Sequence, residues 1–450
     1  MTDAVKCQMS DVKCSVNLNR TKLIIFGITG LFVAILIFAL VFGTKQSPQT
    51  QVVGDILVWG VIDEPDIINQ FVVEFKKSYP KVNITYQKKS ANTYEKDLIN
   101  ALAAGRGPDI FYIHNTWLPK HADKIFPDYE EYMTVNSFRD TFVDVAYNDF
   151  VLGDEIYALP LYVDTLALFY NKDIFNSVGI ANPPSTWEGL LSMVPSLTKK
   201  DSSGGISRSA IAMGTAKNID KATDILSLLM LQSGVKMFDE ERMQTTFDQR
   251  TMENDIEYPS GQQSLEFYVN FSNAKKSVYT WNNQMPYSID AFLEGKTAMM
   301  INYSYQVENL RSRAPHLKFG VSLAPQPKGA QQSVNYADYW GLTVSKTSKY
   351  PDVAWFFAHY LMEKEQSTAY IKMASKPTAR RDLVNTQRNQ ERELGIFAQQ
   401  SLSAYSWYQP DNIAVSKIFE NMIELTASGV SALSAITDAA RKIDLLIPHP

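Results

Sequence analysis

Residues 153–173 read GDEIYALPLYVDTLALFYNKD and are the most informative stretch of the chain for its fold. A short turn leads to Pro160, and an apolar, β-rich run follows it as far as Asn171. Asp164 interrupts this run, although an unpaired carboxylate is costly to bury in an apolar strand. The carboxylate therefore either serves a site or caps and turns the chain where Pro160 has already broken it. The spacing alone favours neither interpretation.

Strands and helices alternate in the part of the chain that precedes this stretch. The expected strands are residues 55–60, 82–87 and 110–113, with amphipathic helices between them. Such alternation is typical of a parallel α/β sheet, whose ligands bind at the carboxyl ends of the strands. The carboxyl end of the first strand carries Trp59 and, just beyond it, Asp63, and Asn115 and Trp117 follow the third strand. These four residues are therefore candidates for a binding site.

The motifs resemble those of the extracellular solute-binding proteins of bacterial sugar ABC transporters, the maltose-binding-protein family. The matching stretches are VWG at 58–60, GPDI at 107–110, GDEIYALP at 153–160, FYNKD at 169–173 and PPSTW at 183–187. The resemblance extends over about residues 55–445 and is loose between 118 and 150. It implies an α/β, two-lobed periplasmic-binding-protein-like fold with a hinge, in which residues 153–173 make the first crossing between the lobes.

The resemblance also implies that the two lobes interleave along the chain. Lobe one is expected to comprise residues 55–162 and 322–362, and lobe two residues 163–321 and 363–450. A strand at residues 319–325 is expected to make the second crossing.

Residue by residue, the resemblance implies a set of cleft contacts. Asp63 and Asp164 are expected to accept hydrogen bonds from sugar hydroxyls, and Tyr305 stands where the family commonly stacks a Trp on a sugar ring. Aromatic faces bury the C–H faces of sugars, and charged acceptors form the stronger hydrogen bonds. Several of the aromatic residues are also compatible with a place in the core. The full set of expected ligand contacts is Trp59, Asp63, Asn115, Trp117, Asp164, Tyr305, Tyr339, Trp340 and Trp407.

An uncharged apolar stretch, Leu23 to Gly43, is long enough to cross a bilayer, which takes about 20 residues. The Lys and Arg residues before it place residues 1–22 in the cytoplasm and everything beyond the linker at 44–54 outside the cell membrane, as a single-pass anchor. A cleaved signal peptide is the alternative. Both cysteines, Cys7 and Cys14, precede the span, so no disulfide or lipoprotein-type anchor is expected beyond it.

Composition and motifs disfavour other classes of function. The net charge of −5 argues against a nucleic-acid surface, which needs a basic stripe. The sequence contains no H-E-x-x-H, no paired Cys and His at metal spacing and no G-x-S-x-G. Asp63 and Asp164 could form a glycosidase pair, but the resemblance favours two hydrogen-bond acceptors. No enzyme activity, cofactor or metal is therefore expected.

The sequence thus predicts a monomeric, membrane-anchored protein that captures an extracellular carbohydrate, most readily an oligosaccharide, and delivers it to an ABC transporter permease. Closure of the two lobes about a hinge would trap the ligand. The alternative is a ligand-sensing co-receptor. Because the cytoplasmic tail has only 22 residues, that function would need a membrane signalling partner.

Overall fold

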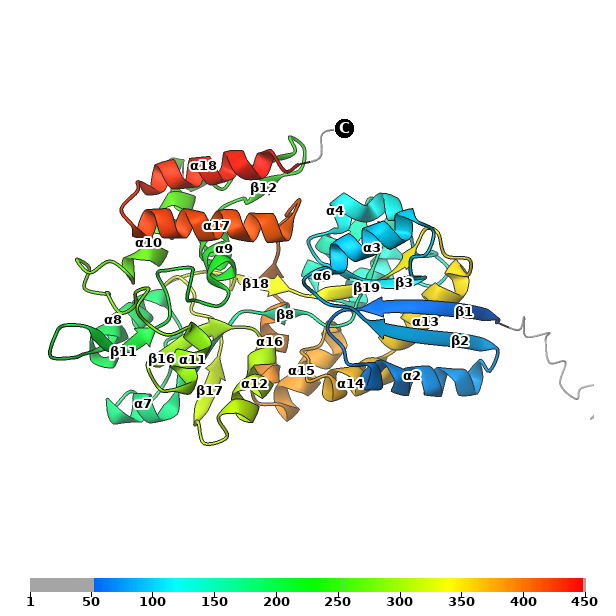
Figure 1. Ribbon diagram of the computed structural model, residues 1–450, viewed down its shortest axis with the longest axis horizontal. Helices are drawn as coiled ribbons and strands as arrows, with labels where there is room; N and C mark the ends of the chain where they lie inside the picture. The colour runs from blue at the N-terminus through cyan, green and yellow to red at the C-terminus, as the bar shows by residue number, and fades with distance from the viewer. Residues whose placement is uncertain (1–51, 254, 448–450) are drawn as a thin grey trace, which may run out of the picture. The chain divides into compact units, whose positions relative to one another are not determined.

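The computed structural model describes residues 52–253 and 255–447. The expected tail, the membrane span Leu23 to Gly43 and most of the linker lie outside these residues. In the part that is described, no helix is long and apolar enough to cross a membrane. From Val53 onward the chain forms one compact unit, which contains two lobes, each built around its own sheet (Figure 1).

The sheet of lobe one has the predicted parallel core. Strand β1 (Gly54–Gly60) pairs in parallel with β2 (Val82–Lys88) and with β3 (Ile110–His114), which confirms these strand predictions. An antiparallel strand from much later in the chain, β19 (Trp340–Ser345), pairs with β3. Two short strands, β4 (Ile125–Phe126) and β7 (Leu159–Pro160), complete the sheet.

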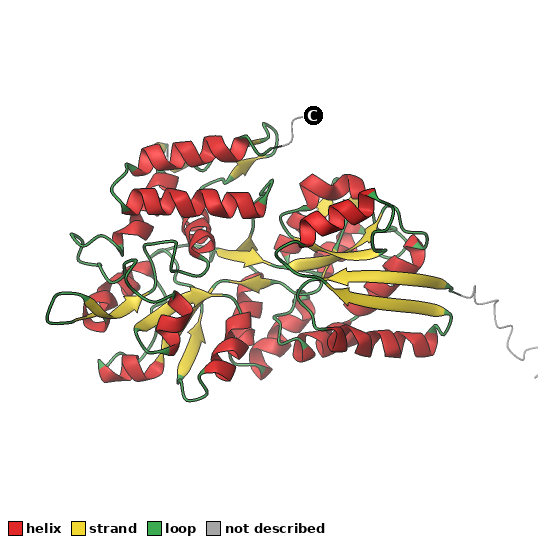
Figure 2. Ribbon diagram, viewed as in Figure 1, coloured by secondary structure: helices red, strands yellow, loops and turns green. Residues whose placement is uncertain are grey.

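Helices flank the sheet of lobe one (Figure 2). They are α2 (Pro65–Ser78), α3 (Tyr94–Ala103), α4 (Leu118–His121), α5 (Val135–Thr141), α6 (Asp144–Phe150) and α13 (Pro351–Met362). Pro65 and Pro351 stand in the first turns of α2 and α13, where the missing amide hydrogen has no intrahelical partner to lose. Phe75 of α2 packs edge-on against Phe357 of α13, with 5.1 Å between the ring centroids.

Lobe two contains an extensive cluster of buried apolar residues. Its sheet has the order β10 (Lys199–Lys200), β11 (Ile206–Ile211), β16 (Thr297–Asn302), β9 (Ala167–Asn171), β17 (Phe319–Ser322). The covering helices are α7 (Lys172–Ser177), α8 (Trp187–Leu197), α9 (Ala222–Gln232), α10 (Ser260–Asn270), α11 (Ser288–Leu293), α12 (Tyr305–Arg313), α16 (Leu394–Ser401), α17 (Asn412–Ala427) and α18 (Ala432–Asp444). Strand β9 is apolar on both faces because helices bury both.

A small three-stranded sheet, which we call the crossing sheet, joins the lobes. It consists of β8 (Asp164–Thr165), β18 (Asn335–Asp338) and β20 (Ala404–Tyr405). The chain runs from β7 in lobe one through β8 to β9 in lobe two, so residues 153–173 make the predicted first crossing. The second crossing runs from β18 into β19, whereas Phe319–Ser322 is an edge strand of lobe two.

The segment after α13 packs on lobe one, although the sequence predicted it in lobe two. Helix α14 (Lys364–Met373) contacts α2, and the Tyr370 hydroxyl reaches Asp63. Helix α15 (Arg381–Gln390) contacts α5. The chain then returns to lobe two through α16, whose Phe397 belongs to that core.

Candidate functional site

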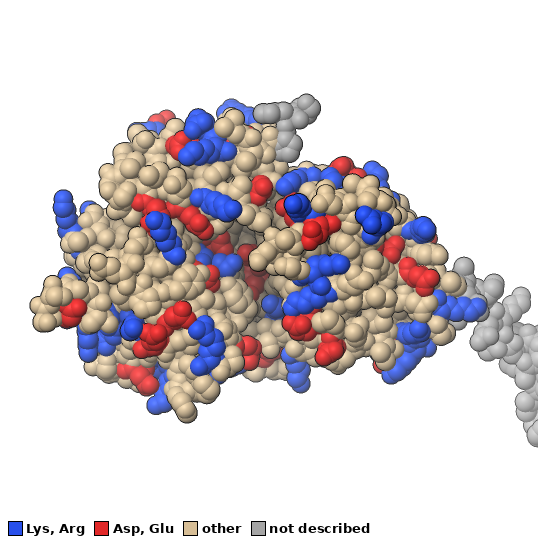
Figure 3. All heavy atoms as spheres, viewed as in Figure 1, with Lys and Arg blue, Asp and Glu red and all other residues tan. Residues whose placement is uncertain are grey.

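Two adjoining cavities lie in the cleft between the lobes. The larger has a volume of about 480 Å³ and the smaller about 290 Å³. Lys221 and Asp338 line both cavities. Figure 3 shows the hollow, with acidic and basic side chains gathered in it. Other residues lining the larger cavity include His114, Asn115, Asp224, Tyr336 and Trp407, and those lining the smaller include Tyr162, Asp164, Tyr303, Tyr305, Trp340 and Lys376.

Asp164 lies in the crossing sheet and holds the start of helix α12 in lobe two. Its carboxylate accepts hydrogen bonds from the Ser304 amide at 3.1 Å, the Ser304 hydroxyl at 2.6 Å and the Thr165 amide at 2.9 Å. Burial raises the pKa of Asp164 to about 6, against the opposing effect of the nearby Lys376 ammonium. Tyr305 directly follows Ser304, so this carboxylate also positions an aromatic residue of the cleft.

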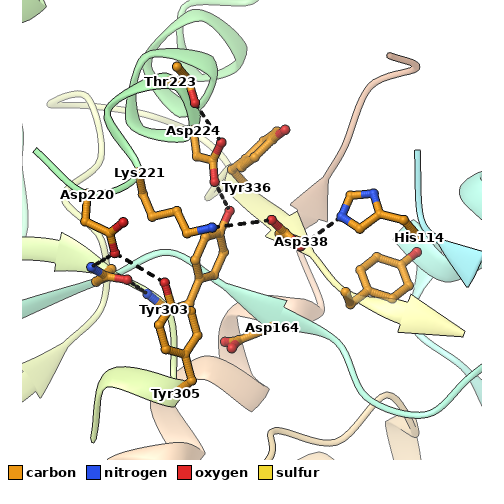
Figure 4. A network of polar contacts seen from close by, with 12 residues as sticks. His114, Asp164, Asp220, Lys221, Thr223, Asp224, Tyr303, Tyr305, Tyr336 and Asp338 are labelled. Carbon is orange, nitrogen blue, oxygen red and sulfur yellow. Dashed lines mark hydrogen bonds and ion pairs between the residues drawn. The ribbon is translucent and has the colours of Figure 1, made fainter. Parts of the chain in front are cut away.

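Asp338, also in the crossing sheet, links side chains of the two lobes (Figure 4). One carboxylate oxygen lies 3.0 Å from Nε2 of His114, at the end of β3 in lobe one. The other lies 4.0 Å from Nζ of Lys221, at the start of α9 in lobe two. Burial alone raises the pKa of Asp338, but the charges of His114 and Lys221 outweigh it and hold the pKa below its ordinary value.

Two tyrosine rings form one wall of the smaller cavity. The rings of Tyr303 and Tyr305 are stacked, with centroids 6.3 Å apart and 24° between their planes. The Tyr303 hydroxyl donates to Asp224 at 2.9 Å, and the Tyr305 hydroxyl donates to Asp220 at 3.3 Å. Two carboxylates of lobe two therefore fix the orientation of these rings (Figure 4).

The two tryptophans that line the cavities come from different elements. Trp340 begins β19 and stands edge-on to Trp117, with centroids 5.2 Å apart. Trp407 follows β20 and packs against Phe419, while its buried indole N–H has no hydrogen-bond acceptor among the described residues. Because buried polar groups are normally paired, this donor suits a ligand acceptor in the larger cavity.

The structure brings five of the nine predicted contacts to the cavities. These are Asn115, Asp164, Tyr305, Trp340 and Trp407. Asn115 lies on the loop after β3 and donates to Asp149 of α6 at 3.1 Å, which holds that loop in place. Tyr305 is 40% exposed, so its ring is free to meet a ligand.

The other four predicted contacts, Trp59, Asp63, Trp117 and Tyr339, are buried behind the cavity walls. Asp63 accepts hydrogen bonds from the Tyr112 hydroxyl at 2.6 Å and the Tyr370 hydroxyl at 3.0 Å, so its carboxylate is already satisfied within lobe one. Burial raises the pKa of Asp63 above its ordinary value.

The other buried residues, Trp117, Tyr339 and Trp59, lie behind the cavity walls and support them. Trp117 stacks on Tyr94 with centroids 6.1 Å apart, and its indole N–H donates to Asn412 of α17 at 3.3 Å. The Tyr339 hydroxyl donates to Asp149 at 2.6 Å. Trp59 is buried, and its ring is covered by the Lys89 ammonium at 3.8 Å.

Sequence reasoning missed several residues of the cleft. Lys221 and Asp224 come from a helix start that carries no recognisable signal, Lys376 comes from a turn, and His114 ends strand β3. The Lys376 ammonium forms no hydrogen bond or ion pair with the described residues and lies 4.9 Å from the Tyr162 ring centroid. For Tyr303, the one indication of a place in the cavity wall is that it lies close to Tyr305 in the sequence.

The arrangement provides hydrogen-bond acceptors, ammonium donors and aromatic faces from both lobes. This combination suits a polar organic ligand. Among residues 52–253 and 255–447, no group of three or more His, Cys, Asp and Glu side chains is arranged to hold a metal ion.

Comparison with known proteins is consistent with this geometry. A family model described as bacterial extracellular solute-binding protein matches residues 61–368, more than half of the chain. A putative binding protein of Brucella abortus (strain 2308) is 21% identical over 389 residues, which cover 83% of this chain and 88% of that protein. The maltotriose-binding protein of Pyrococcus abyssi is 22% identical over 316 residues, which cover 67% of this chain and 62% of that protein.

Solved structures share the two-lobed fold. The cyclic α-maltosyl-1,6-maltose binding protein from Arthrobacter globiformis has a TM-score of 0.73 at 18% identity, covering 88% of this chain and 99% of its own. The sugar-binding protein MalE from Xanthomonas citri has a TM-score of 0.72 at 20% identity, covering 88% and 97%. These likenesses confirm the fold class that the sequence motifs predict. Together with the family match, they show that the chain belongs to the family of bacterial extracellular solute-binding proteins.

Proposed function

We propose that this protein captures a carbohydrate, specifically an oligosaccharide, in the cleft between its lobes and delivers it to the permease of an ABC transporter. The observation that carries the proposal is the pair of adjoining cavities that meet at Lys221 and Asp338 and take their walls from both lobes. The relatives named for maltotriose and cyclic α-maltosyl-1,6-maltose support a saccharide as the ligand class.

The lining of the cavities matches the chemistry of sugars. Trp340 and Tyr305 offer aromatic faces to the C–H faces of a ring, as aromatic side chains do at binding sites generally. Asn115, Asp338 and the Trp407 indole offer hydrogen-bonding groups to hydroxyls. Two adjoining cavities give room for more than one sugar ring, which favours an oligosaccharide over a monosaccharide.

Capture would proceed by closure of the lobes about the crossing sheet. The crossings at β8 and β18 are short and lie side by side, so small backbone rotations there would move one lobe relative to the other. A ligand that contacts both lobes binds the closed form better and therefore shifts the population toward it.

We further propose that the stretch Leu23 to Gly43 anchors the protein in the cell membrane as a single span. The binding unit would then lie outside the cytoplasm and act as a monomer beside the permease. The charge pattern on the two sides of the stretch supports this orientation. Protease treatment of intact cells tests it, because an external binding unit is digested while residues 1–22 are protected.

Thermal unfolding against a panel of mono- and oligosaccharides tests the proposed binding. A saccharide at 100 times its Kd should stabilise the protein by about 2.7 kcal/mol. The same saccharide should give a smaller shift with Tyr305→Ala, because that variant loses an aromatic wall of the cleft. If no saccharide raises the melting temperature, carbohydrate capture is excluded and amino-acid, phosphate-ester and peptide panels follow.

A further inference from the structure

The ammonium group of Lys221 lies in a cage of aromatic rings and carboxylates inside the cleft. Its Nζ is 5.2 Å from the ring centroid of Tyr303, 6.0 Å from that of Tyr305 and 4.0 Å from a carboxylate oxygen of Asp338. Ammonium groups are attracted to the faces of aromatic rings at such distances. We call the site formed by Tyr303, Tyr305 and Asp338 the ammonium cage (Figure 4).

Lys221 is poorly suited to its own place in the backbone. Its φ of 61° lies in the left-handed region, which favours glycine over a residue with a long side chain. It also caps the N-terminus of α9, where the helix dipole disfavours a positive charge. A residue that departs from two local preferences at once points to a role in the cleft rather than in the helix.

The surroundings of the cage carry more negative than positive charge. Asp338 borders the cage, and Asp220 and Asp224 hold the hydroxyls of its two tyrosines. Burial by itself lowers the pKa of Lys221, but the carboxylates, led by Asp338 and Asp224, outweigh it and hold the pKa above its ordinary value. The cleft therefore stabilises a cation at this position.

We propose that the ammonium cage is a subsite for an ammonium group of the ligand, so that the captured saccharide carries an amino sugar. This inference rests on the proposed carbohydrate capture. In the present structure the Lys221 side chain occupies the cage as an internal stand-in for that group. An incoming ligand ammonium takes its place over the two rings and beside Asp338.

The geometry allows this exchange without rebuilding the site. The two rings are fixed by Asp220 and Asp224, so they stay in place when the Lys221 side chain swings away. The Lys221 side chain is 30% exposed and lines both cavities, so open space to receive it lies beside the cage. Lysine is suited to such movement because its stem is flexible.

Chemical rescue of Lys221→Ala tests the cage independently of the saccharide. This variant leaves the carboxylates without their cation and should unfold at a lower temperature than the wild-type protein. Ethylammonium chloride should restore the melting temperature by several degrees more than sodium chloride at the same ionic strength. The matched control Lys236→Ala removes a lysine that is 67% exposed on lobe two and should show no ammonium-specific rescue. Equal effects of the two salts on Lys221→Ala would overturn the cage.

The choice of saccharide tests the ligand class on the wild-type protein and needs no variant. We would compare β-1,4-linked tetramers of glucosamine, N-acetylglucosamine and glucose. The pH is kept below the pKa of the glucosamine amino groups, so that they carry a positive charge. The glucosamine tetramer should bind at least tenfold more tightly than the other two, which lack a positive charge. Binding of the uncharged tetramers with equal affinity would overturn the amino-sugar inference and leave carbohydrate capture standing. Failure of all three, and of the wider saccharide panel, would overturn both.

Discussion

Asp164 and Asp338 lie directly opposite each other on adjacent antiparallel strands of the crossing sheet. Residues in this relationship project to the same face, and like charges there destabilise the pair. The two carboxyl groups have different pKa values, which reduces the repulsion between them. Burial raises the pKa of Asp164 to about 6, whereas His114 and Lys221 keep the pKa of Asp338 below its ordinary value. The junction of the lobes thus carries electrostatic repulsion that donors from a ligand can relieve.

Asp164→Ala should weaken saccharide binding at least tenfold. The variant leaves the Ser304 amide and hydroxyl without their acceptor, so Tyr305 loses its fixed position beside the cleft. We also expect the free energy of unfolding to fall by about 2 kcal/mol, since buried donors would be left unpaired. Calorimetric titration and urea denaturation measure the two effects.

The control for this variant is Asp173→Ala, which removes an exposed carboxylate 3.7 Å from Lys318. A surface ion pair of this kind contributes about 1 kcal/mol or less. Wild-type affinity in Asp164→Ala would show that the contact between Asp164 and Ser304 has no part in binding.

Tyr305→Ala should lower saccharide affinity by about tenfold or more, because a stacked aromatic contact contributes about 0.5–1.5 kcal/mol beyond its buried area. Tyr305→Phe should keep most of the affinity, since it keeps the ring and loses the hydroxyl, with its 3.3 Å contact to Asp220. Titration calorimetry compares the two. Tyr350→Ala is the control, because Tyr350 is similarly exposed, 38% against 40%, and lines neither cavity. Equal affinity in Tyr305→Ala and the wild-type protein would remove Tyr305 from the site.

The stability of the protein should decrease as pH rises from about 4 to 6, in part because of Asp149. Burial raises the pKa of this carboxyl group from 3.8 to about 6, so the folded state binds its proton more tightly than the unfolded state does. The stability lost over this interval amounts to at most about 3 kcal/mol, at 1.36 kcal/mol per pKa unit, and no more is lost above the folded pKa.

Asp149→Asn lacks the titrating group and should show a shallower fall over the same interval. The titratable side chains that interact with Asp149 are His114, Tyr336 and Tyr339, and the variant leaves all three in place. Urea denaturation at pH 4, 5, 6 and 7 gives the slope. An unchanged slope would mean that Asp149 ionises at the same pH in the folded and unfolded states.

Gly341→Ala should destabilise lobe one by about 1–3 kcal/mol, the usual cost of overpacking. A Cβ at this position would lie 2.6 Å from the Phe150 ring and 3.0 Å from the Leu159 carbonyl oxygen. Phe150→Leu removes part of the clash, so the cost of Gly341→Ala should be smaller in that background. Equal costs in the two backgrounds, measured by chemical denaturation, would show that Phe150 is not the obstacle.

Much of the fold could be predicted from the sequence because local patterns determine it. The alternation of strands and helices from 55 to 114 predicts the parallel core of lobe one, and the motif at residues 153–173 predicts the first crossing. The second crossing could not be placed by pattern. Residues 319–322 and 335–338 are both short strands, and only tertiary pairing shows that β18 leads into β19 and lobe one.

The candidate site was predictable where the family motif and the strand ends coincide, as at Asp164 and Asn115. Asp63 follows a strand end too, yet two tyrosine hydroxyls from β3 and α14 already satisfy it. Lys221 and Lys376 reach the cleft only because segments distant in sequence fold against it. No local pattern of residues marks Lys221 as a cleft residue.

Calorimetric titration of the wild-type protein and of the double variant Tyr305→Ala/Trp340→Ala shows whether a carbohydrate binds in the cleft between the lobes. The titrant is the saccharide that raises the wild-type melting temperature most. We expect one site per chain in the wild-type protein and at least hundredfold weaker binding in the double variant, which lacks an aromatic wall from each lobe. Equal affinity in the two proteins, or no binding heat with any saccharide, would contradict capture of a carbohydrate in this cleft.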